Sequence, residues 1–305
     1  QSKEFNSSFS IDDRTRSFLK IQDGCNYGCS FCTIPLARGK SRSAKPSDIL
    51  SKINSLIDNG AKEIILSGIN IGDYGILNGK RKNNFFSLLK IIEDEIDDLR
   101  LRISSIEPNL LNDKIIELVA SSKKFVNHFH IPLQSGSNNI LKKMSRRYNI
   151  ELYEDRIKKI KKLMPDACIG ADVIVGFPGE SNHEFKKTLK FIKSLDISYL
   201  HVFPYSERNN TRAIEINDII PQSKRYERSK VLRELSEKKK RKFYNSNLNL
   251  SKEVLFENKI KDGYIFGYTD NYIRTKVKYK KDYIGKIFKT KLKSIDEDFN
   301  TIGKI

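Results

Sequence analysis

The sequence predicts an α/β protein in two parts: a large part of alternating strands and helices, followed by a small all-β barrel. About six strand-like segments alternate with helical segments over residues 16–205, which is typical of parallel strands joined by right-handed crossovers. Beyond residue 250 the pattern changes to short strands split by Gly, Asp and Asn turns, as in small β-barrels. The six βα units alone fit either a doubly wound open sheet or a partial barrel.

The size and composition of the chain fit a folded protein of about two domains. The hydrophobic share of its 305 residues is modest, at 38%, but the aromatic fraction of 10% is enough for a sizeable core. Apolar runs are only a few residues long, whereas a membrane span needs roughly 20 apolar residues. No signal peptide is visible at the N-terminus. We therefore expect a cytoplasmic protein with no membrane partner.

The charge is strongly positive. The 57 Lys and Arg residues outnumber the 38 Asp and Glu residues, giving a formal net charge of +19 and a pI near 9.6. Such an excess favours a polyanionic partner, either nucleic acid or an anionic membrane surface. A genome rich in A and T would also raise the Lys content, and the abundance of Ile, Asn and Lys supports that alternative.

The elements of the large part follow one another in a regular order. Strands are predicted at residues 18–21, 62–67, 99–105, 126–133, 168–175 and 197–203. Helices are predicted from residue 46 to just before Gly60, and at residues 85–97, 112–122, 137–144, 150–163 and 181–195. The segment 68–84 begins at Gly68, carries Gly72, Gly75 and Gly79, and is predicted to be a loop.

The first of these helices has clear signals at both ends. Ser47 is predicted as its N-cap, directly after Pro46. One apolar stripe follows, made of Ile49, Leu50, Ile53, Leu56 and Ile57. Gly60 suits the left-handed residue that ends many helices.

A long and very basic helix is predicted over residues 221–245, near the junction of the two parts. It carries five consecutive basic residues from Lys238 to Lys242. Short strands are then predicted at residues 254–256, 264–266, 272–274, 277–279 and 285–287. The predicted organisation is a linker at 1–13, a core with its basic helix at 14–245, and a β-barrel at 246–305.

Polar and glycine residues gather directly after the predicted strands. In both types of parallel α/β fold the functional site lies at the carboxyl ends of the strands. The residues in these positions are the cysteines of segment 25–32, Ser67, Gly68, Glu107, Gln134, Ser135, the segment 176–179, Tyr205 and Ser206. We therefore expect a site at one rim of the sheet.

Three of the four cysteines lie in one short loop with the spacing CxxxCxxC: Cys25, Cys29 and Cys32. A disulfide scaffold would spread its cysteines along the chain, and a structural zinc site normally has four ligands. Three thiolates in one loop fit a [4Fe-4S] cluster with one iron left open to bind a small molecule. A zinc site completed by a distant His, and free thiols, are the alternatives. Cys168 lies in an apolar stretch and is predicted to be a buried core residue.

This motif, with Phe31 before the last cysteine and at the first strand–helix junction, resembles that of the radical S-adenosylmethionine (radical SAM) superfamily. Longer blocks resemble the methylthiotransferases of that superfamily. They are IQDGCN (21–26), IPLARG (34–39), SRS (41–43), HIPLQSGS (130–137), DVIVGFPGE (172–180) and YSER (205–208). The resemblance covers essentially residues 14–305.

The resemblance implies the fold and the cofactors. The core would be a radical SAM partial (βα)6 barrel, and the C-terminal part would be a TRAM barrel, an RNA-binding module. Cys25, Cys29 and Cys32 would bind three irons of a [4Fe-4S] cluster. The amino and carboxylate groups of S-adenosyl-L-methionine (SAM) would chelate the fourth. An electron donor such as flavodoxin or ferredoxin would then trigger release of a 5′-deoxyadenosyl radical.

Further segments favour one branch of the family. NIGDYG (70–75), SSIEP (104–108), HVFPYS (201–206) and TDNYI (269–273) resemble the enzymes that add a methylthio group to C2 of N6-threonylcarbamoyladenosine at position 37 of tRNA. The isopentenyladenosine branch and the ribosomal-protein branch match less well. The basic C-terminal barrel favours RNA over a basic protein as the substrate. A non-enzymatic iron–sulfur RNA-binding protein is the alternative from another class.

The family pattern includes an N-terminal domain with three more cysteines, which hold a second [4Fe-4S] cluster used in sulfur insertion. No cysteine precedes Cys25, and the chain begins with Gln rather than Met. We therefore expect either a fragment or a truncated gene product that is incomplete for sulfur insertion. The second cluster is expected only in a full-length protein.

The resemblance also suggests residues that contact SAM or the substrate. The predicted SAM contacts are Ser67, Gly68, Glu107, Gln134, Ser135, Gly176 and Pro178. Arg38 is a further candidate for contact with cofactor or substrate. His130 is predicted to pack or hydrogen-bond rather than catalyse, and to face away from His128. No catalytic base is predicted, because the radical scheme requires none.

Overall fold

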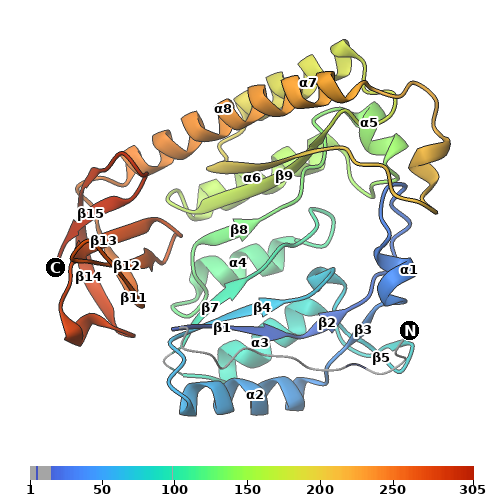
Figure 1. The fold of residues 1–305 in the computed structure, drawn as a ribbon. Helices are drawn as coiled ribbons and strands as arrows, with labels where there is room; N and C mark the ends of the chain where they lie inside the picture. The colour runs from blue at the N-terminus through green and yellow to red at the C-terminus, as the bar shows by residue number, and fades with distance from the viewer. Residues whose placement is uncertain (1–4, 6–14, 98) are drawn as a thin grey trace.

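Six parallel strands form the framework of the core (Figure 1). They are β1 (Arg16–Lys20), β4 (Glu63–Ser67), β7 (Arg100–Ile103), β8 (His128–His130), β9 (Cys168–Val175) and β10 (Tyr199–Pro204). The computed structural model describes residue 5, residues 15–97 and residues 99–305. The predicted linker at 1–13 lies, apart from Phe5, outside the described residues.

The strands follow one another in space in the same order as in the chain. One sheet has the order β1-β4-β7 and the other has the order β10-β9-β8. Parallel bridges from Leu101 to Phe125 and from Ser105 to His130 join the two sheets between β7 and β8. Because the strand order never reverses, the core is a partial barrel and not a doubly wound sheet.

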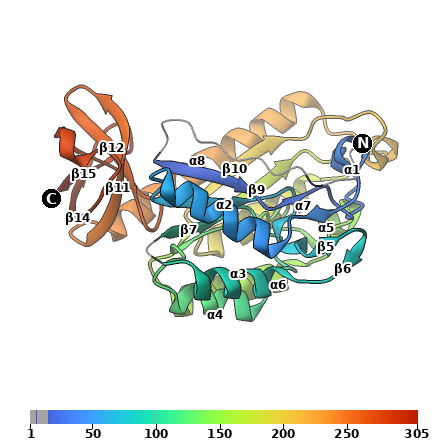
Figure 2. The same cartoon turned by 90° about the horizontal axis from the view of Figure 1, so that it is seen from below.

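Helices cover the outside of the partial barrel (Figures 1 and 2). They are α1 (Ile34–Arg38), α2 (Pro46–Asp58), α3 (Phe85–Glu95), α4 (Asp113–Ser121), α5 (Asn138–Lys143), α6 (Ile150–Leu163), α7 (Asn182–Ser194) and α8 (Gln222–Ser246). Every predicted helix is present, and β9 has the predicted bounds. No helix of the described residues is long and apolar enough to cross a membrane.

The segment 68–84 is more ordered than the predicted loop. It contains a single 3-10 turn at Ile71–Asp73 and a hairpin of β5 (Ile76–Leu77) and β6 (Lys80–Arg81). These elements are only two or three residues long, so they leave no periodic pattern in the sequence. A second short pair, β2 (Gln22–Asp23) and β3 (Arg42–Ser43), flanks the cysteine loop.

The ends of α2 confirm one predicted cap and correct the other. Gly60 has φ +87° and its N–H bonds to the carbonyl of Ile57, while the N–H of Ala61 bonds to the carbonyl of Leu56. These bonds form a Schellman motif. Ser47 is not the N-cap: the extended residue before the helix is Lys45, because Pro46 takes the first helical position.

The two faces of the parallel strands have opposite chemistry, since side chains alternate along a strand. One set of alternate residues packs under the helices in the main hydrophobic core, including Leu19, Leu66, Leu101, Phe129, Val173 and Leu200. The other set faces the interior of the partial barrel and includes Glu63, Arg102, His130, Asp172 and His201. The interior therefore carries several charged and polar side chains.

The C-terminal part is a five-stranded closed barrel with the strand order β11-β12-β13-β15-β14. Its strands are β11 (Ser251–Lys261), β12 (Tyr264–Thr269), β13 (Arg274–Lys278), β14 (Ile287–Ile295) and β15 (Thr301–Lys304). The strands predicted separately at 272–274 and 277–279 form one strand, β13, which begins after a turn at Tyr272 with φ +66°. The strand predicted at 285–287 overlaps β14 only at Ile287, and β15 was not predicted.

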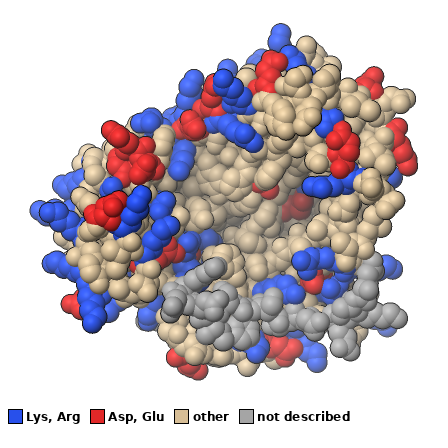
Figure 3. Space-filling model, viewed as in Figure 1, with Lys and Arg blue, Asp and Glu red and all other residues tan. Residues whose placement is uncertain are grey.

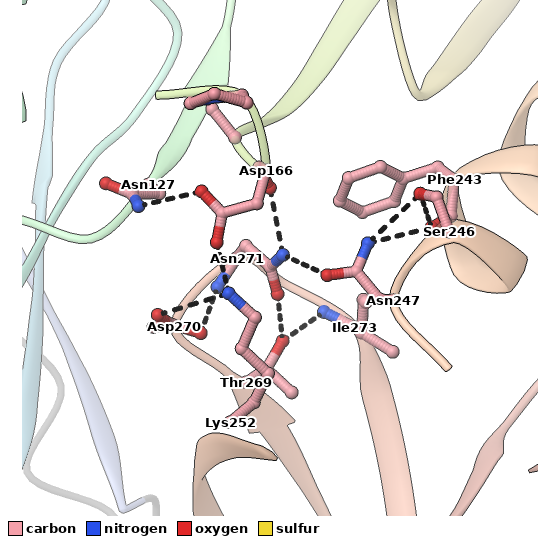
Figure 4. Close-up of polar contacts among 12 residues, drawn as sticks. Asn127, Asp166, Phe243, Ser246, Asn247, Lys252, Thr269, Asp270, Asn271 and Ile273 are labelled. Atoms are coloured by element: carbon pink, nitrogen blue, oxygen red, sulfur yellow. Dashed lines mark hydrogen bonds and ion pairs between the residues drawn. The ribbon is translucent and has the colours of Figure 1, made fainter. Parts of the chain in front are cut away.

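Buried amides attach the C-terminal barrel to the core (Figure 4). The Nδ2 group of Asn271 donates to the backbone carbonyl of Asp166, at 2.9 Å, and to Oδ1 of Asn247, at 2.9 Å. The carboxylate of Asp166 pairs with Lys252 of β11 and accepts from Asn127. One side chain of the barrel thus contacts both the loop before β9 and the end of α8.

An ionic cluster makes a second junction, at the N-terminal ends of the strands. Arg16 pairs with Glu257 of the C-terminal barrel at 2.8 Å. Inside the core, the fully buried Glu63 accepts from Arg102 at 2.9 Å and lies 3.9 Å from Arg100. Burial alone would raise the pKa of Glu63, but the arginines outweigh burial and hold that pKa below its ordinary value.

We predict that Asn271→Ala lowers the free energy of unfolding by about 1–3 kcal/mol, because it leaves buried polar partners in Asp166 and Asn247 without a donor. Urea denaturation measures the change. The exposed Asn258 supplies the control, since Asn258→Ala is expected to stay within about 0.5 kcal/mol of wild type. Equal stability of the two variants would contradict this account of the junction.

Candidate cluster and cofactor site

The cysteine loop follows β2 at the rim of the partial barrel formed by the carboxyl ends of the strands (Figure 1). A tight turn begins it: Gly24 has φ +69°, and a Cβ there would lie 2.2 Å from the carbonyl oxygen of Lys40. The N–H of Cys25 bonds to the carbonyl of Gly39 at 3.1 Å. This position therefore requires glycine.

The other end of the loop is attached to α5 and to a 3-10 turn at Arg212–Glu215. Ser30 donates from its N–H to the carbonyl of Met144, and from its hydroxyl to the carbonyl of Lys143. The N–H of Ala213 donates to the carbonyl of Ser30 at 2.8 Å. Phe31 packs edge-on against Phe177, with ring centroids 6.3 Å apart. The loop is thus fixed by contacts from distant parts of the chain.

Gln22 ties the base of the cysteine loop together. This fully buried side chain donates to the carbonyl of Gly24 at 2.8 Å and to the hydroxyl of Ser41 at 2.9 Å. Its Oε1 accepts from the N–H of Asn70 at 2.8 Å. It also lies 3.0 Å from where a Cβ at Gly68 would be, so the segment after β4 lies directly against it.

The three thiols are half-buried, and their sulfur atoms do not all lie within 4.8 Å of one another. Among the described residues, only His130, Asp172 and His201 bring three ligand atoms within 4.8 Å of one another. A single zinc ion with Zn–S bonds of about 2.3 Å would hold its sulfurs about 3.8 Å apart. The three sulfurs are therefore spread more widely than one zinc ion would hold them. Burial raises the pKa of both Cys25 and Cys29.

Arg146 joins the cysteine loop to Glu107. One guanidinium nitrogen donates to Sγ of Cys29 at 3.1 Å, and another pairs with the Glu107 carboxylate. Burial raises the pKa of Glu107, with Arg146 opposing that change. The guanidinium therefore places one positive charge between the sulfur of Cys29 and the largely buried carboxylate of Glu107. Neither Gln22 nor Arg146 was predicted as a site residue.

The predicted SAM contacts lie at the ends of successive strands, as expected. Ser67 ends β4 and its carbonyl accepts from Ile21 at 2.9 Å, while Gly68 follows it. Gln134 has φ +62° and its backbone pairs with β9, leaving its side chain partly exposed. The hydroxyl of Ser135 is buried and lies 3.2 Å from that of Thr188 in α7.

The turn after β9 contains Gly176 and the buried Pro178. Gly176 has φ +72°, and a Cβ there would lie 2.3 Å from Cγ of Arg225. Its N–H donates to the carboxylate of Glu180, which also lies 3.3 Å from Arg228. Burial raises the pKa of Glu180 to about 7, against the opposing effect of Arg228.

Arg38 lies on the rim with about half of its side chain exposed, 3.5 Å from Asp23. Asp23 also pairs with Arg42 at 2.7 Å, and its carboxylate accepts from the N–H of Gly24. Arg38 is therefore held near the start of the cysteine loop while its surface remains open to solvent.

His130 and His201 both contact Asp172 inside the partial barrel, at 3.0 Å and 3.2 Å from its Oδ1 atom. His130 hydrogen-bonds, as predicted. The expectation that it faces away from His128 is wrong: both rings stack near Tyr199, because residues two apart on a strand share a face. The space-filling view shows a hollow near the centre of this side of the molecule, with Lys and Arg around it (Figure 3).

A family model described as "Radical SAM superfamily" matches residues 19–192. The chain belongs to the radical SAM superfamily. Membership in this superfamily implies a [4Fe-4S] cluster and SAM as cofactors, and the three-thiol loop fits the first of these.

Similar curated proteins carry methylthiotransferase names. The chain is 42% identical over 293 residues to "Threonylcarbamoyladenosine tRNA methylthiotransferase MtaB" of Bacillus subtilis (strain 168), covering 94% of this chain and 64% of that protein. The protein of the same name from Rickettsia prowazekii is 37% identical, with 95% and 67% covered. A "tRNA-2-methylthio-N(6)-dimethylallyladenosine synthase" of Endomicrobium trichonymphae is 36% identical, with 93% and 66% covered. The chain thus spans about two thirds of these relatives' length.

Solved structures share the fold of the core. Coproporphyrinogen III oxidase (HemN) from Escherichia coli, a radical SAM enzyme, matches with a TM-score of 0.53 at 13% identity, covering 75% of this chain and 54% of that one. The radical SAM methyltransferase TsrM from Kitasatospora setae matches with a TM-score of 0.51 at 16% identity, covering 61% and 35%. These likenesses confirm the partial barrel.

We predict that Cys25→Ala, Cys29→Ala and Cys32→Ala each abolish stable iron and sulfide binding after anaerobic reconstitution. Cys168→Ala is the matched control, because burial raises the pKa of that thiol to about 12 and keeps it protonated. Iron and sulfide analysis measures the outcome. Wild-type iron content in any variant of the loop would contradict the assignment.

A pH dependence follows from Glu180. Its pKa is about 7 in the folded protein against an ordinary 4.5, so its stabilising contribution is present below pH 4.5 and is lost as the pH rises through about 7. We predict that Glu180→Gln removes this pH-dependent loss of stability. Urea unfolding of the cluster-free protein at several pH values measures it, with the exposed Glu234→Gln as control. A Glu180→Gln profile parallel to that of the control would contradict the prediction.

Proposed function

We propose that this chain is the radical SAM core and RNA-binding part of a tRNA methylthiotransferase. Its reaction would add a methylthio group to C2 of N6-threonylcarbamoyladenosine at position 37. The observation that carries the proposal is the loop of three thiols at the rim of a partial barrel, in a chain that is similar to methylthiotransferases over more than nine tenths of its length.

When bound, the cluster and SAM supply the one-electron chemistry that can remove hydrogen from an unactivated carbon such as C2. The chain positions them. Gln22 fixes the base of the loop, and Arg146 offsets the negative charge of Cys29 and Glu107. No polar base is needed at C2, and we assign none.

SAM would lie across the rim, against the ends of the strands. We assign its contacts to the backbone at Ser67 and Gly68 and to the side chains of Glu107 and Gln134. Gly176 and Pro178 would form the far wall. The hydroxyl of Ser135 is engaged by Thr188, so Ser135 would contribute through its backbone. Arg38 would approach cofactor or substrate from the open side.

The tRNA would be held by α8 and the C-terminal barrel. Residues 246–305 contain thirteen Lys and Arg against eight Asp and Glu, and Lys and Arg side chains gather over this end of the molecule (Figure 3). Neutralising phosphates releases counterions, so binding would weaken steeply with salt. We propose residues 14–245 as the radical SAM unit and 246–305 as a TRAM-like RNA-binding unit.

The complete protein would act in the cytoplasm with further parts. A second [4Fe-4S] cluster would belong to the portion of its relatives that this chain does not span. An electron donor such as flavodoxin or ferredoxin would supply the reducing equivalents. These components bear on sulfur insertion and reduction, and none of them changes the role proposed for the three thiols.

We predict that tRNA from cells lacking the gene contains no 2-methylthio-N6-threonylcarbamoyladenosine and accumulates its unthiolated precursor. Nucleoside mass spectrometry measures both. A full-length gene with Cys168→Ala should restore the modification, and one with Cys25→Ala should not. Loss of the isopentenyl counterpart instead would assign the protein to that branch, and unchanged tRNA would refute the proposed substrate.

One assay distinguishes the proposed enzyme from the alternative of another class. A non-enzymatic iron–sulfur RNA-binding protein would not cleave SAM. The reconstituted chain is expected to form 5′-deoxyadenosine from SAM under dithionite, and failure to form it would favour the binding protein.

A further inference from the structure

A cavity of about 350 Å³ lies between the core and the C-terminal barrel. Tyr199 of β10, Lys240 and Tyr244 of α8, and Tyr268, Tyr272 and Arg274 around β12 and β13 line it. Its volume is in the range of small-molecule sites. The cavity is well separated in the chain from the cysteine loop, and the cluster chemistry does not use it.

Two cations face this cavity without an acidic partner. In the part of the chain that the structure describes, neither Lys240 nor Arg274 forms an ion pair with a carboxylate. Glu237 raises the pKa of Lys240, but by less than burial and Arg274 lower it. Lys240 contacts the rings of Tyr244 and Phe299 instead. Burial and the nearby Arg274 both lower the pKa of Lys240, so the pair of cations would be stabilised by an anion.

The other walls of the cavity are mostly aromatic. Tyr268 and Tyr272 stack with centroids 4.9 Å apart, and the Tyr244 hydroxyl accepts from the N–H of Arg274 at 3.2 Å. These contacts hold the rings in place before any ligand binds. An aromatic wall beside two unpaired cations matches a nucleotide, which combines a flat base with a phosphate.

His201 links this cavity to the interior of the partial barrel. It lines the cavity, and its Nδ1 atom contacts Asp172 in the polar interior at 3.2 Å. β10 is an edge strand of the partial barrel, and the cavity lies against its amino-terminal half. The cavity therefore adjoins the open side of the barrel, about one strand length from the rim at the carboxyl ends. A nucleotide in the cavity would therefore be close in the RNA chain to the nucleotide in the barrel.

We propose that this cavity binds one nucleoside monophosphate unit of the RNA substrate, a neighbour of the nucleotide that enters the partial barrel. Lys240 and Arg274 hold its phosphate, and the tyrosine rings contact its base. This inference rests on the proposed function, because it takes the RNA from there. A free nucleotide has the same chemistry, and the experiment separates the two sources.

The test measures binding of an anticodon stem-loop RNA to the reconstituted chain by fluorescence anisotropy. Lys240→Gln and Arg274→Gln are each expected to weaken binding about tenfold, since each removes a charged hydrogen bond to phosphate. The control is Lys186→Gln, which removes the same charge from an exposed position on α7, outside the proposed RNA-binding surface. It is expected to weaken binding about twofold or less. Equal binding of the RNA by all three variants would overturn the inference about the cavity. The separate proposal that the chain binds RNA would stand.

A second measurement reports on the cavity directly. The chain has no Trp, so Tyr268→Trp places a single fluorophore in the cavity wall. The stem-loop RNA is expected to change its emission, and AMP at the same nucleotide concentration is not. A response to AMP with no binding of the RNA would keep the cavity as a nucleotide site but refute the proposed substrate. No response to either ligand would overturn the inference.

Discussion

The opposite chemistry of the two strand faces is the constraint on which the rest of the structure depends. Each parallel strand buries one set of alternate side chains under the helices, as Leu66 and Val173 do. The other set is then left to line the interior, where Glu63 and Asp172 each need partners to remain charged. The same alternation that builds the core therefore produces a polar chamber below the cysteine loop.

The site at the rim combines local and distant contributions. The turn at Gly24 sets the start of the loop through a backbone contact that no larger residue allows. Its orientation depends on partners far away in sequence: the carbonyls of Lys143 and Met144, and the guanidinium of Arg146. A cluster ligand set needs thiolates held in a partly buried place, where desolvation disfavours them. The cation at Arg146 offsets part of that cost.

Much of this architecture could be predicted from the sequence, because the strongest sequence signals are local. The strand of residues 168–175 and the Schellman end of α2 at Gly60 follow from pattern and from glycine chemistry. The CxxxCxxC spacing locates the three thiols that we propose as cluster ligands in one loop. Residues whose roles depend on tertiary contact could not be found this way: Gln22 and Arg146 look like ordinary polar residues until the fold buries them against the loop.

The dependence on tertiary contacts also explains the sequence predictions that were wrong. Ser47 is a good capping residue by type, yet Pro46 occupies the first turn and moves the boundary back to Lys45. In the C-terminal barrel, short strands join or shift because pairing with neighbours decides their ends. The cavity between core and barrel also has no sequence signal, since its tyrosines and cations come from three separate segments.

The central claim is that three thiols of one loop hold a [4Fe-4S] cluster with an iron open to SAM. The most direct test is the electron paramagnetic resonance spectrum of the reduced, reconstituted chain, recorded before and after SAM is added. The account predicts a [4Fe-4S] signal whose g values shift on addition of SAM, because SAM binds the open iron. A signal that SAM leaves unchanged, or the absence of a [4Fe-4S] signal, would contradict it.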